Sequence, residues 1–166
     1  MHWIESTGGP LILIDRLFLS KWGGVRRSSD LNYGSDYERA CDTDDYAETI
    51  SISGGEALIL GDEPNRATII SRSSEEIIIV RWRWAPSEKA VQEHLEKLDD
   101  KHFENATNLR IRFQGEEAIM FDSSLSGSEL DDSIIVKLTP GEYLVETAIY
   151  EPDNETCLLL HRLRLS

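Results

Sequence analysis

The sequence has 166 residues, 40% of them hydrophobic, which is enough to bury the core of one domain or of two small joined halves. Its 31 acidic and 17 basic residues give a formal net charge of −14. That charge disfavours nucleic acids and anionic membrane surfaces as partners, because both are themselves negatively charged. The negative charge suits a cationic partner protein. Alternatively, the acidic residues only keep the protein soluble.

The sequence offers no membrane-spanning or secretory segment. It contains no run of about 18 apolar residues, the length that a spanning helix needs. Its start, MHWIESTGGPLILID, lacks the basic region and the long apolar stretch of a signal peptide. We therefore expect a soluble, cytoplasmic protein. Cys41 and Cys157 lie far apart without metal or redox spacing, so we expect free thiols.

The first part of the chain reads as short strands joined by turns. An apolar run at 10–14 predicts a strand, the residues RLFLSKW after it predict a turn of helix, and residues 23–35 predict a loop rich in Gly, Ser and Asn. Four further strands are predicted at 49–53, 56–60, 67–71 and 75–84. Gly54 and Gly55 between the first two are typical of a hairpin turn.

The strand at 75–84, EEIIIVRWRW, has the strongest pattern in the chain. Alternation places Ile78 and Trp82 on one face and Arg81 and Arg83 on the other. The apolar run in its first half predicts burial on both faces.

One helix is predicted at 87–103, with Ser87 as its N-cap and apolar residues at three-to-four spacing along one face. Strand patterns then resume, separated by turns that contain Gly, Pro or Asn. These C-terminal strands are predicted at 109–113, 117–123, 133–138, 142–150 and 157–165.

These elements predict a mostly β protein of the α+β class, with antiparallel sheets forming a sandwich or half-barrel and one long helix near 87–103. We expect residues 1–166 to form a single compact unit. The alternative is a subdivision into an N-terminal β half, 1–86, and a C-terminal β half, 104–166, joined by the helix at 87–103.

Catalytic and cofactor motifs are missing. His94 and His102 do not have the HExxH spacing, and Cys157 and His161 lie roughly 13 Å apart along one strand face, too far for a dyad. No glycine pair extends into a phosphate-binding loop, and the run of acids at 42–45 lacks the Gly and closing Glu of an EF-hand. We therefore predict no enzymatic activity, no cofactor and no bound metal.

An enzyme of unknown type, acting on a small molecule or holding a metal, remains the rival hypothesis. It would use scattered carboxylates such as Asp122 and Glu146 together with His161 or His102. A pocket in which a histidine and carboxylates converge would favour it. A third hypothesis, a subunit of a larger assembly, predicts a broad apolar patch instead.

The feature that stands out is segregated charge. Between Asp36 and Glu63 there are nine acids and one base, Arg39, a local net charge of −8. A second stretch, 114–136, contains six acids and no Lys or Arg. Tyrosines interleave with the first block, and carboxylates with tyrosines on a loop suit a protein-binding face, because tyrosine provides rigid contact area and the acids attract a basic partner. An ordinary solvated loop, held to the core by its tyrosines, is the alternative.

Several strings resemble the immunity protein 21 family of bacterial polymorphic toxin systems. In the N-terminal half these are WIESTGGPL (3–11), WGG (22–24), DYERAC (36–41) and GEALILGDEP (55–64). The C-terminal half contributes the looser matches FDS (121–123), GEY (141–143) and LLLHRL (158–163). The resemblance implies a non-enzymatic cytoplasmic antidote that binds a toxin domain encoded beside it.

We therefore expect an immunity protein that neutralises a cognate toxin domain by binding its basic surface, such as that of a nuclease. The expected contact residues are the acids and tyrosines of the first block: Asp36, Tyr37, Glu38, Asp42, Asp44, Asp45, Tyr46, Asp62 and Glu63. Their carboxylates would take the place of nucleic acid phosphates.

Overall fold

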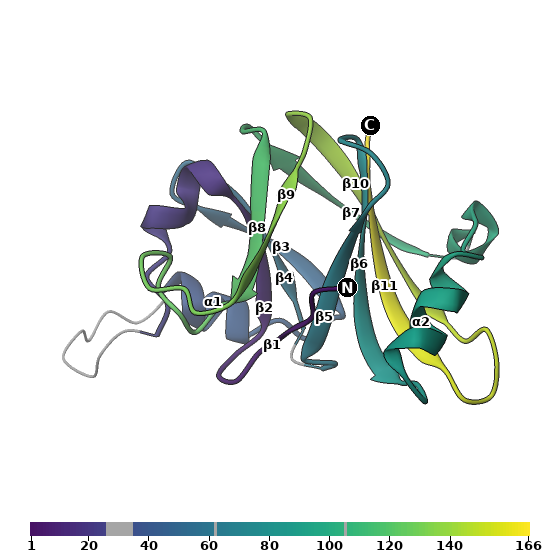
Figure 1. The fold of residues 1–166 in the computed structure, drawn as a ribbon. Coiled ribbons are helices and arrows are strands. Elements are labelled where there is room, and N and C mark those ends of the chain that lie inside the picture. Colours follow the sequence, from purple (N-terminus) through teal and green to yellow (C-terminus); the bar gives the residue numbers. More distant parts are fainter. Residues whose placement is uncertain (26–34, 62, 105) are drawn as a thin grey trace.

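The computed structural model describes residues 1–25, 35–61, 63–104 and 106–166. Within these ranges two antiparallel sheets pack face to face (Figure 1). The six-stranded sheet has the order β1 (Ile4–Glu5), β5 (Arg66–Ser71), β6 (Glu76–Trp84), β11 (Cys157–Leu165), β10 (Gly141–Tyr150) and β7 (Thr107–Phe113). The five-stranded sheet has the order β3 (Ala47–Ile52), β4 (Gly55–Leu60), β2 (Leu11–Asp15), β8 (Glu117–Asp122) and β9 (Ser133–Lys137).

This architecture confirms the predicted class, a mostly β protein with two antiparallel sheets arranged as a sandwich. The central strands are buried on both faces. In β2, for example, Leu11 and Leu13 join the core between the sheets, while Ile12 and Ile14 join a second core on the outer face. The sequences of such strands are continuous apolar runs, because both faces of the strand pack against other layers.

Helices provide the outer layers. The 3-10 helix η1 (Arg16–Lys21) and the short helix α1 (Asp36–Cys41) cover the outer face of the five-stranded sheet, where Phe18 and Ala40 are buried. Helix α2 (Glu88–Leu95) and the 3-10 helix η2 (Asp100–Phe103) cover the outer face of the six-stranded sheet. Figure 1 shows α1 and α2 on opposite sides of the molecule. The order is therefore helix, sheet, sheet, helix.

The helix predicted at 87–103 is present in two pieces. Ser87 is its N-cap as predicted, since its hydroxyl accepts a hydrogen bond from Ala90 N at 3.1 Å. The helix tightens at its end, where Leu98 N donates to Leu95 O, and Asp99 then adopts an extended backbone (φ −126°, ψ 178°). The Asp99 carboxylate accepts from Lys101 N at 3.0 Å and begins η2. A single long helix was therefore wrong, because Asp99 is a better N-cap than a helix-interior residue.

The predicted hairpin between β3 and β4 is confirmed, with Ile52 paired to Gly55. Gly54 has a φ of +93°, a conformation that favours glycine. A Cβ at Gly55 would collide with the ring of Phe18 from η1. Both glycines are therefore required, one for the turn and one for the close packing of η1 over it.

Each sheet contains strands from both halves of the sequence. In the six-stranded sheet, β6 from the first half pairs along its length with β11 from the second. In the five-stranded sheet, β2 pairs with β8 in the same way. The core between the sheets is accordingly built from residues on both sides of α2.

Candidate functional site

The acidic segment, defined here as residues 36–46, consists of α1 and the loop that leads into β3. The sequence predicted a loop throughout, and the helix is a correction. A capping box begins α1: Ser35 Oγ accepts from Glu38 N, and Glu38 Oε2 accepts from Ser35 N, both at 3.2 Å. Ser-x-x-Glu is a recognised helix-start pattern, and acids in the first turn also interact favourably with the helix dipole.

The first three residues of the acidic segment hold α1 in place. Tyr37 is half-buried, and its hydroxyl donates to Gly8 O at 2.5 Å, which attaches the helix to the loop before β2. Asp36 pairs with Arg39, whose guanidinium also donates to Ser51 O on β3 at 2.6 Å. Tyr37 therefore anchors the segment, as the alternative interpretation from the sequence supposed.

The acids after α1 are differently placed. Asp42, Asp44 and Asp45 are all exposed, and no described Lys or Arg lies within ion-pair distance of any of them. The carboxylate of Asp45 accepts only the local bond from Tyr46 N at 2.9 Å. These three carboxylates thus present negative charge to solvent from one short loop.

Tyr46 is 38% exposed and lies at the end of that loop. Its hydroxyl accepts from Arg83 at 3.4 Å, and the Arg83 guanidinium lies 5.7 Å from the ring centroid. Its carbonyl accepts from Gly61 N at 3.0 Å, which fixes the backbone. Tyr46 therefore combines a fixed backbone with an accessible ring, as suits an interface residue.

Of the two remaining predicted contact residues, Asp62 lies outside the described residues. Glu63 is exposed and forms part of the lining of a surface cavity of about 350 Å³. Cys41, the last residue of α1, lines the same cavity together with residues 6–9 and Asn65. The fold therefore brings Glu63, which lies 17 residues beyond the end of the acidic segment, next to that segment.

A second acidic group joins this region, and the sequence did not place it. Leu130, in the loop between β8 and β9, packs against the same apolar cluster as Tyr37 and Ala40 of α1. The acids on either side of Leu130, Glu129 and Asp131, are exposed. Sequence reasoning identified both acidic stretches, but only the packing of Leu130 shows that the second stretch covers the same apolar cluster as α1.

Arg81 is the residue whose role sequence reasoning missed. It is fully buried on the inner face of β6, and its guanidinium donates to three backbone carbonyls. The distances are 2.9 Å to Pro64 O and 3.2 Å to Tyr46 O, and the third acceptor is Gly61 O. Arg81 therefore ties the loop after β4 to the end of the acidic segment. Its position among Ile and Trp residues in a buried strand was the available signal.

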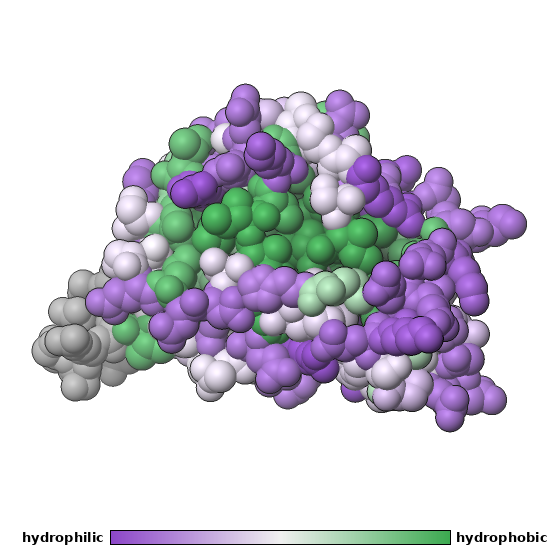
Figure 2. All heavy atoms as spheres, viewed as in Figure 1, coloured by the Kyte–Doolittle hydropathy of each residue, from purple (hydrophilic) through white to green (hydrophobic). Residues whose placement is uncertain are grey.

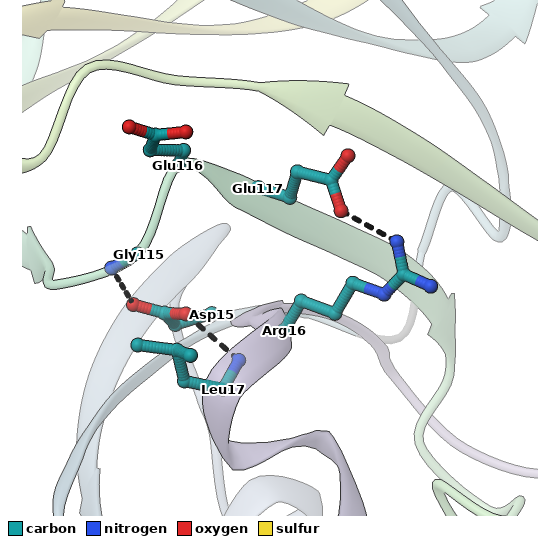
Figure 3. A pocket seen from close by; sticks show the side chains of 6 residues that line it. All are labelled: Asp15, Arg16, Leu17, Gly115, Glu116 and Glu117. Atoms are coloured by element: carbon teal, nitrogen blue, oxygen red, sulfur yellow. Dashed lines mark hydrogen bonds and ion pairs between the residues drawn. The ribbon is translucent and has the colours of Figure 1, made fainter.

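A surface hollow of about 540 Å³ lies next to Asp15 (Figure 3). Asp15 is fully buried, and its carboxylate accepts from Gln114 N and Gly115 N at 2.7 Å and from Leu17 N at 2.9 Å. Arg16 and Glu117 pair with each other at 2.5 Å across the hollow. Asp15, Arg16 and Glu117 are thus engaged within the fold, and Asp15 clamps the β7–β8 turn to the start of η1.

The residues that the enzyme hypothesis would use do not converge. Glu146 and His161 lie on paired strands but face opposite sides of the sheet: Glu146 binds Arg162 at 2.8 Å on the outer face, while His161 faces the inside. Asp122 lies in the other sheet. There it accepts hydrogen bonds from Thr7 and Ser124 backbone amides; burial alone would raise its pKa, but these bonds outweigh burial and lower it.

His102 is the remaining histidine of that hypothesis, and it packs edge-on against Tyr150. The described part of the chain contains no group of three or more His, Cys, Asp or Glu side chains arranged to hold a metal ion. Cys41 and Cys157 are not joined in a disulfide, and Cys157 is buried.

His161 is fully buried, and its Nδ1 lies 2.8 Å from Thr147 Oγ1. Its Nε2 has no hydrogen-bond partner among the described residues. Burial, and secondarily the positive charge of Arg81, hold the pKa of His161 well below its usual value of 6.5. The imidazole is therefore neutral in the folded protein.

This neutral histidine predicts loss of stability in acid. An unfolded His161 takes up a proton as the pH falls below about 6.5 while the folded one does not, so the free energy of unfolding should fall by up to about 1.4 kcal/mol per pH unit. Above that pH the contribution is fully present. Urea unfolding of the wild type and of His161→Gln from about pH 7.5 to about pH 5 measures it. The wild type should lose more stability than the variant, and parallel losses would contradict the assignment.

The family model described as Immunity protein 21 matches residues 2–156. No curated protein and no solved structure matches the chain. In the described ranges, every helix is too short or too polar to cross a bilayer. Because the family model spans nearly the whole sequence, the chain belongs to the Immunity protein 21 family.

Proposed function

We propose that this immunity protein neutralises a cognate toxin domain by binding it directly through the acidic segment, without catalysis. The observation that carries the proposal is the set of exposed carboxylates at Asp42, Asp44 and Asp45, which have no described cationic partner. A folded protein gains no internal stability from such a cluster, because neighbouring like charges repel. A cationic partner offsets that repulsion on binding.

The proposed partner surface is basic, and a nuclease active site is the form that fits best. A nuclease binds a polyanion and therefore presents Lys and Arg side chains around its catalytic groups. Aspartates in a row on a fixed loop would occupy the positions of successive phosphates. Tyr46 and Glu63 extend the proposed contact beyond the loop, and Glu129, exposed beside Leu130, extends it further.

The net charge of −14 supports a protein as the partner. It opposes binding to nucleic acid and to anionic membranes, so we propose a protein partner alone. We place the protein in the cytoplasm, where a nuclease toxin would find its substrate. No cofactor or metal enters the mechanism.

Coexpression tests this function. The toxin domain encoded beside this chain should arrest growth when expressed alone, and coexpression of the chain should restore growth and yield a copurifying complex. A catalytically inactivated toxin domain should still copurify, because the proposed interaction is binding. Rescue without any complex would indicate another mode of protection, and absence of both would refute the proposal.

A further inference from the structure

The side of the sandwich where β5 and β9 approach each other is apolar and accessible. Figure 2 shows an apolar area there, between polar rims. Ile69 of β5 and Ile134 of β9 pack against the core between the sheets but are only partly buried. Contacts close the two ends of this opening: His2 with Asp132 at 2.9 Å, and Thr139 N with Ser74 O at 2.7 Å. The apolar surface between them is covered by no other described element.

The outer edge of β9 borders this opening. β9 is the last strand of its sheet and pairs only with β8. No described residue donates or accepts a hydrogen bond along its other edge. An edge strand with unsatisfied backbone groups is a template for another strand.

The edge strands β3 and β7 each have a backbone group that bonds to a side chain of another element. Arg39 of α1 donates to Ser51 O on β3 at 2.6 Å. Glu56 accepts from Arg112 N on β7 at 2.7 Å. Side chains thus occupy edge groups of β3 and β7, whereas β9 has no such contact in the described part of the chain.

The side chains of β9 lack the features that usually protect an edge strand from pairing. Ile135, at the centre of the strand, is 48% exposed on the outer face. It lies opposite Ile119 of β8, so the exposed side chain continues an apolar row. Proteins commonly protect an open edge with central charges, proline or a bulge, and β9 has none of these.

The charges at the two ends of β9 are self-complementary. Asp131 lies two residues before the strand and Lys137 ends it, and both are exposed. Strand alternation places Lys137 on the face that Ile135 occupies. Lys137 forms no ion pair with a described carboxylate; Glu117, opposite it on β8, is engaged with Arg16. In an antiparallel pair of two β9 strands centred on Ile134, each Asp131 lies across from the Lys137 of the other copy.

We propose that β9 is a homodimerisation edge, at which a second copy of this chain adds antiparallel to form one continuous ten-stranded sheet from two five-stranded ones. The same symmetric contact places the two apolar openings against each other. β9 and β3 lie at opposite edges of the five-stranded sheet, so the loop before β3 with Asp44 and Asp45 stays accessible in the dimer.

Light scattering during gel filtration of the full chain tests this proposal, because it measures mass without any toxin. The wild type should be a dimer. Asp131→Lys and Lys137→Asp should each place two like-charge pairs in the interface and weaken the dimer by about tenfold or more. An equimolar mixture of the two variants should recover a dimer, because both cross-strand pairs then become attractive again.

Ile135→Lys should also give a monomer, and Ile149→Lys is its matched control. Ile149 has the same exposed fraction, 48%, but lies in β10, an interior strand of the other sheet. Circular dichroism should show all variants folded. A monomeric wild type, or a dimer unaffected by Ile135→Lys and the charge variants, would overturn the proposal. A monomer that loses toxin binding on Ile135→Lys would instead assign this edge to the toxin.

Discussion

Reversing the charges of Asp42, Asp44 and Asp45 to lysine is expected to weaken toxin binding by about 100- to 1000-fold. Each exposed carboxylate in a charged interface contributes roughly 1 kcal/mol, and reversal replaces attraction by repulsion, so three sites together give about 3 to 4 kcal/mol. The effect should appear largely in the association rate, and it should shrink at high salt because salt screens exposed charges. Surface plasmon resonance at two salt concentrations measures both.

A matched triple variant separates the position of the charges from the net charge. Glu96, Glu104 and Glu155 are exposed acids around the helices on the far side of the six-stranded sheet, and no described Lys or Arg pairs with them. Reversing these three changes the net charge by the same amount. Affinity should fall only slightly. Equal losses in the two triple variants would show that long-range attraction, and not the acidic segment, determines binding.

Replacing Arg81 by methionine is expected to lower the free energy of unfolding by about 3 to 5 kcal/mol. The substitution keeps the apolar stem but removes the donors to Pro64 O, Tyr46 O and Gly61 O. Tyr46 O keeps its bond from Gly61 N, so Pro64 O and Gly61 O are the acceptors that lose this donor. Burying an acceptor without a partner costs roughly 1 to 3 kcal/mol. Chemical denaturation monitored by tryptophan fluorescence measures the loss.

Arg83→Met provides the comparison for Arg81. Arg83 lies two residues further along the same strand face, is only half-buried, and contacts the Tyr46 side chain instead of backbone carbonyls. Its replacement should cost less than about 1 kcal/mol. Arg81→Met should also reduce toxin affinity under conditions where it remains folded, because Arg81 holds the backbone at Tyr46. Similar stabilities for the two variants would contradict the assigned role of Arg81.

Much of the fold was predictable because nearly every strand carries its own signal. The run at 75–84 and the glycines at 54–55 specify a strand and a hairpin through local patterns of apolar and turn residues. The order of strands within the sheets was not predictable, since it depends on pairings between distant segments such as β6 with β11. From this pairing of the two sequence halves we propose that residues 1–166 fold as one unit.

The candidate site was predictable in composition but not in arrangement. Counting acids identified the segment that begins at Asp36. Which of its residues anchor α1, as Tyr37 does, and which face solvent, as Asp44 does, depends on packing. The capping box at Ser35 and Glu38 was a local signal for α1 that a reading of the segment as a loop overlooked. The role of a buried arginine such as Arg81 is hard to predict from sequence. Strand alternation predicts the face on which Arg81 lies, but not which backbone carbonyls cover that face.

The most direct test of neutralisation by acidic contact is a calorimetric titration of the purified chain into the purified, catalytically inactivated toxin domain at two salt concentrations. Saturation is expected at one chain per toxin domain, with affinity that falls as salt rises from about 50 to about 300 mM. Absence of binding at low salt, or an affinity independent of salt, would contradict it.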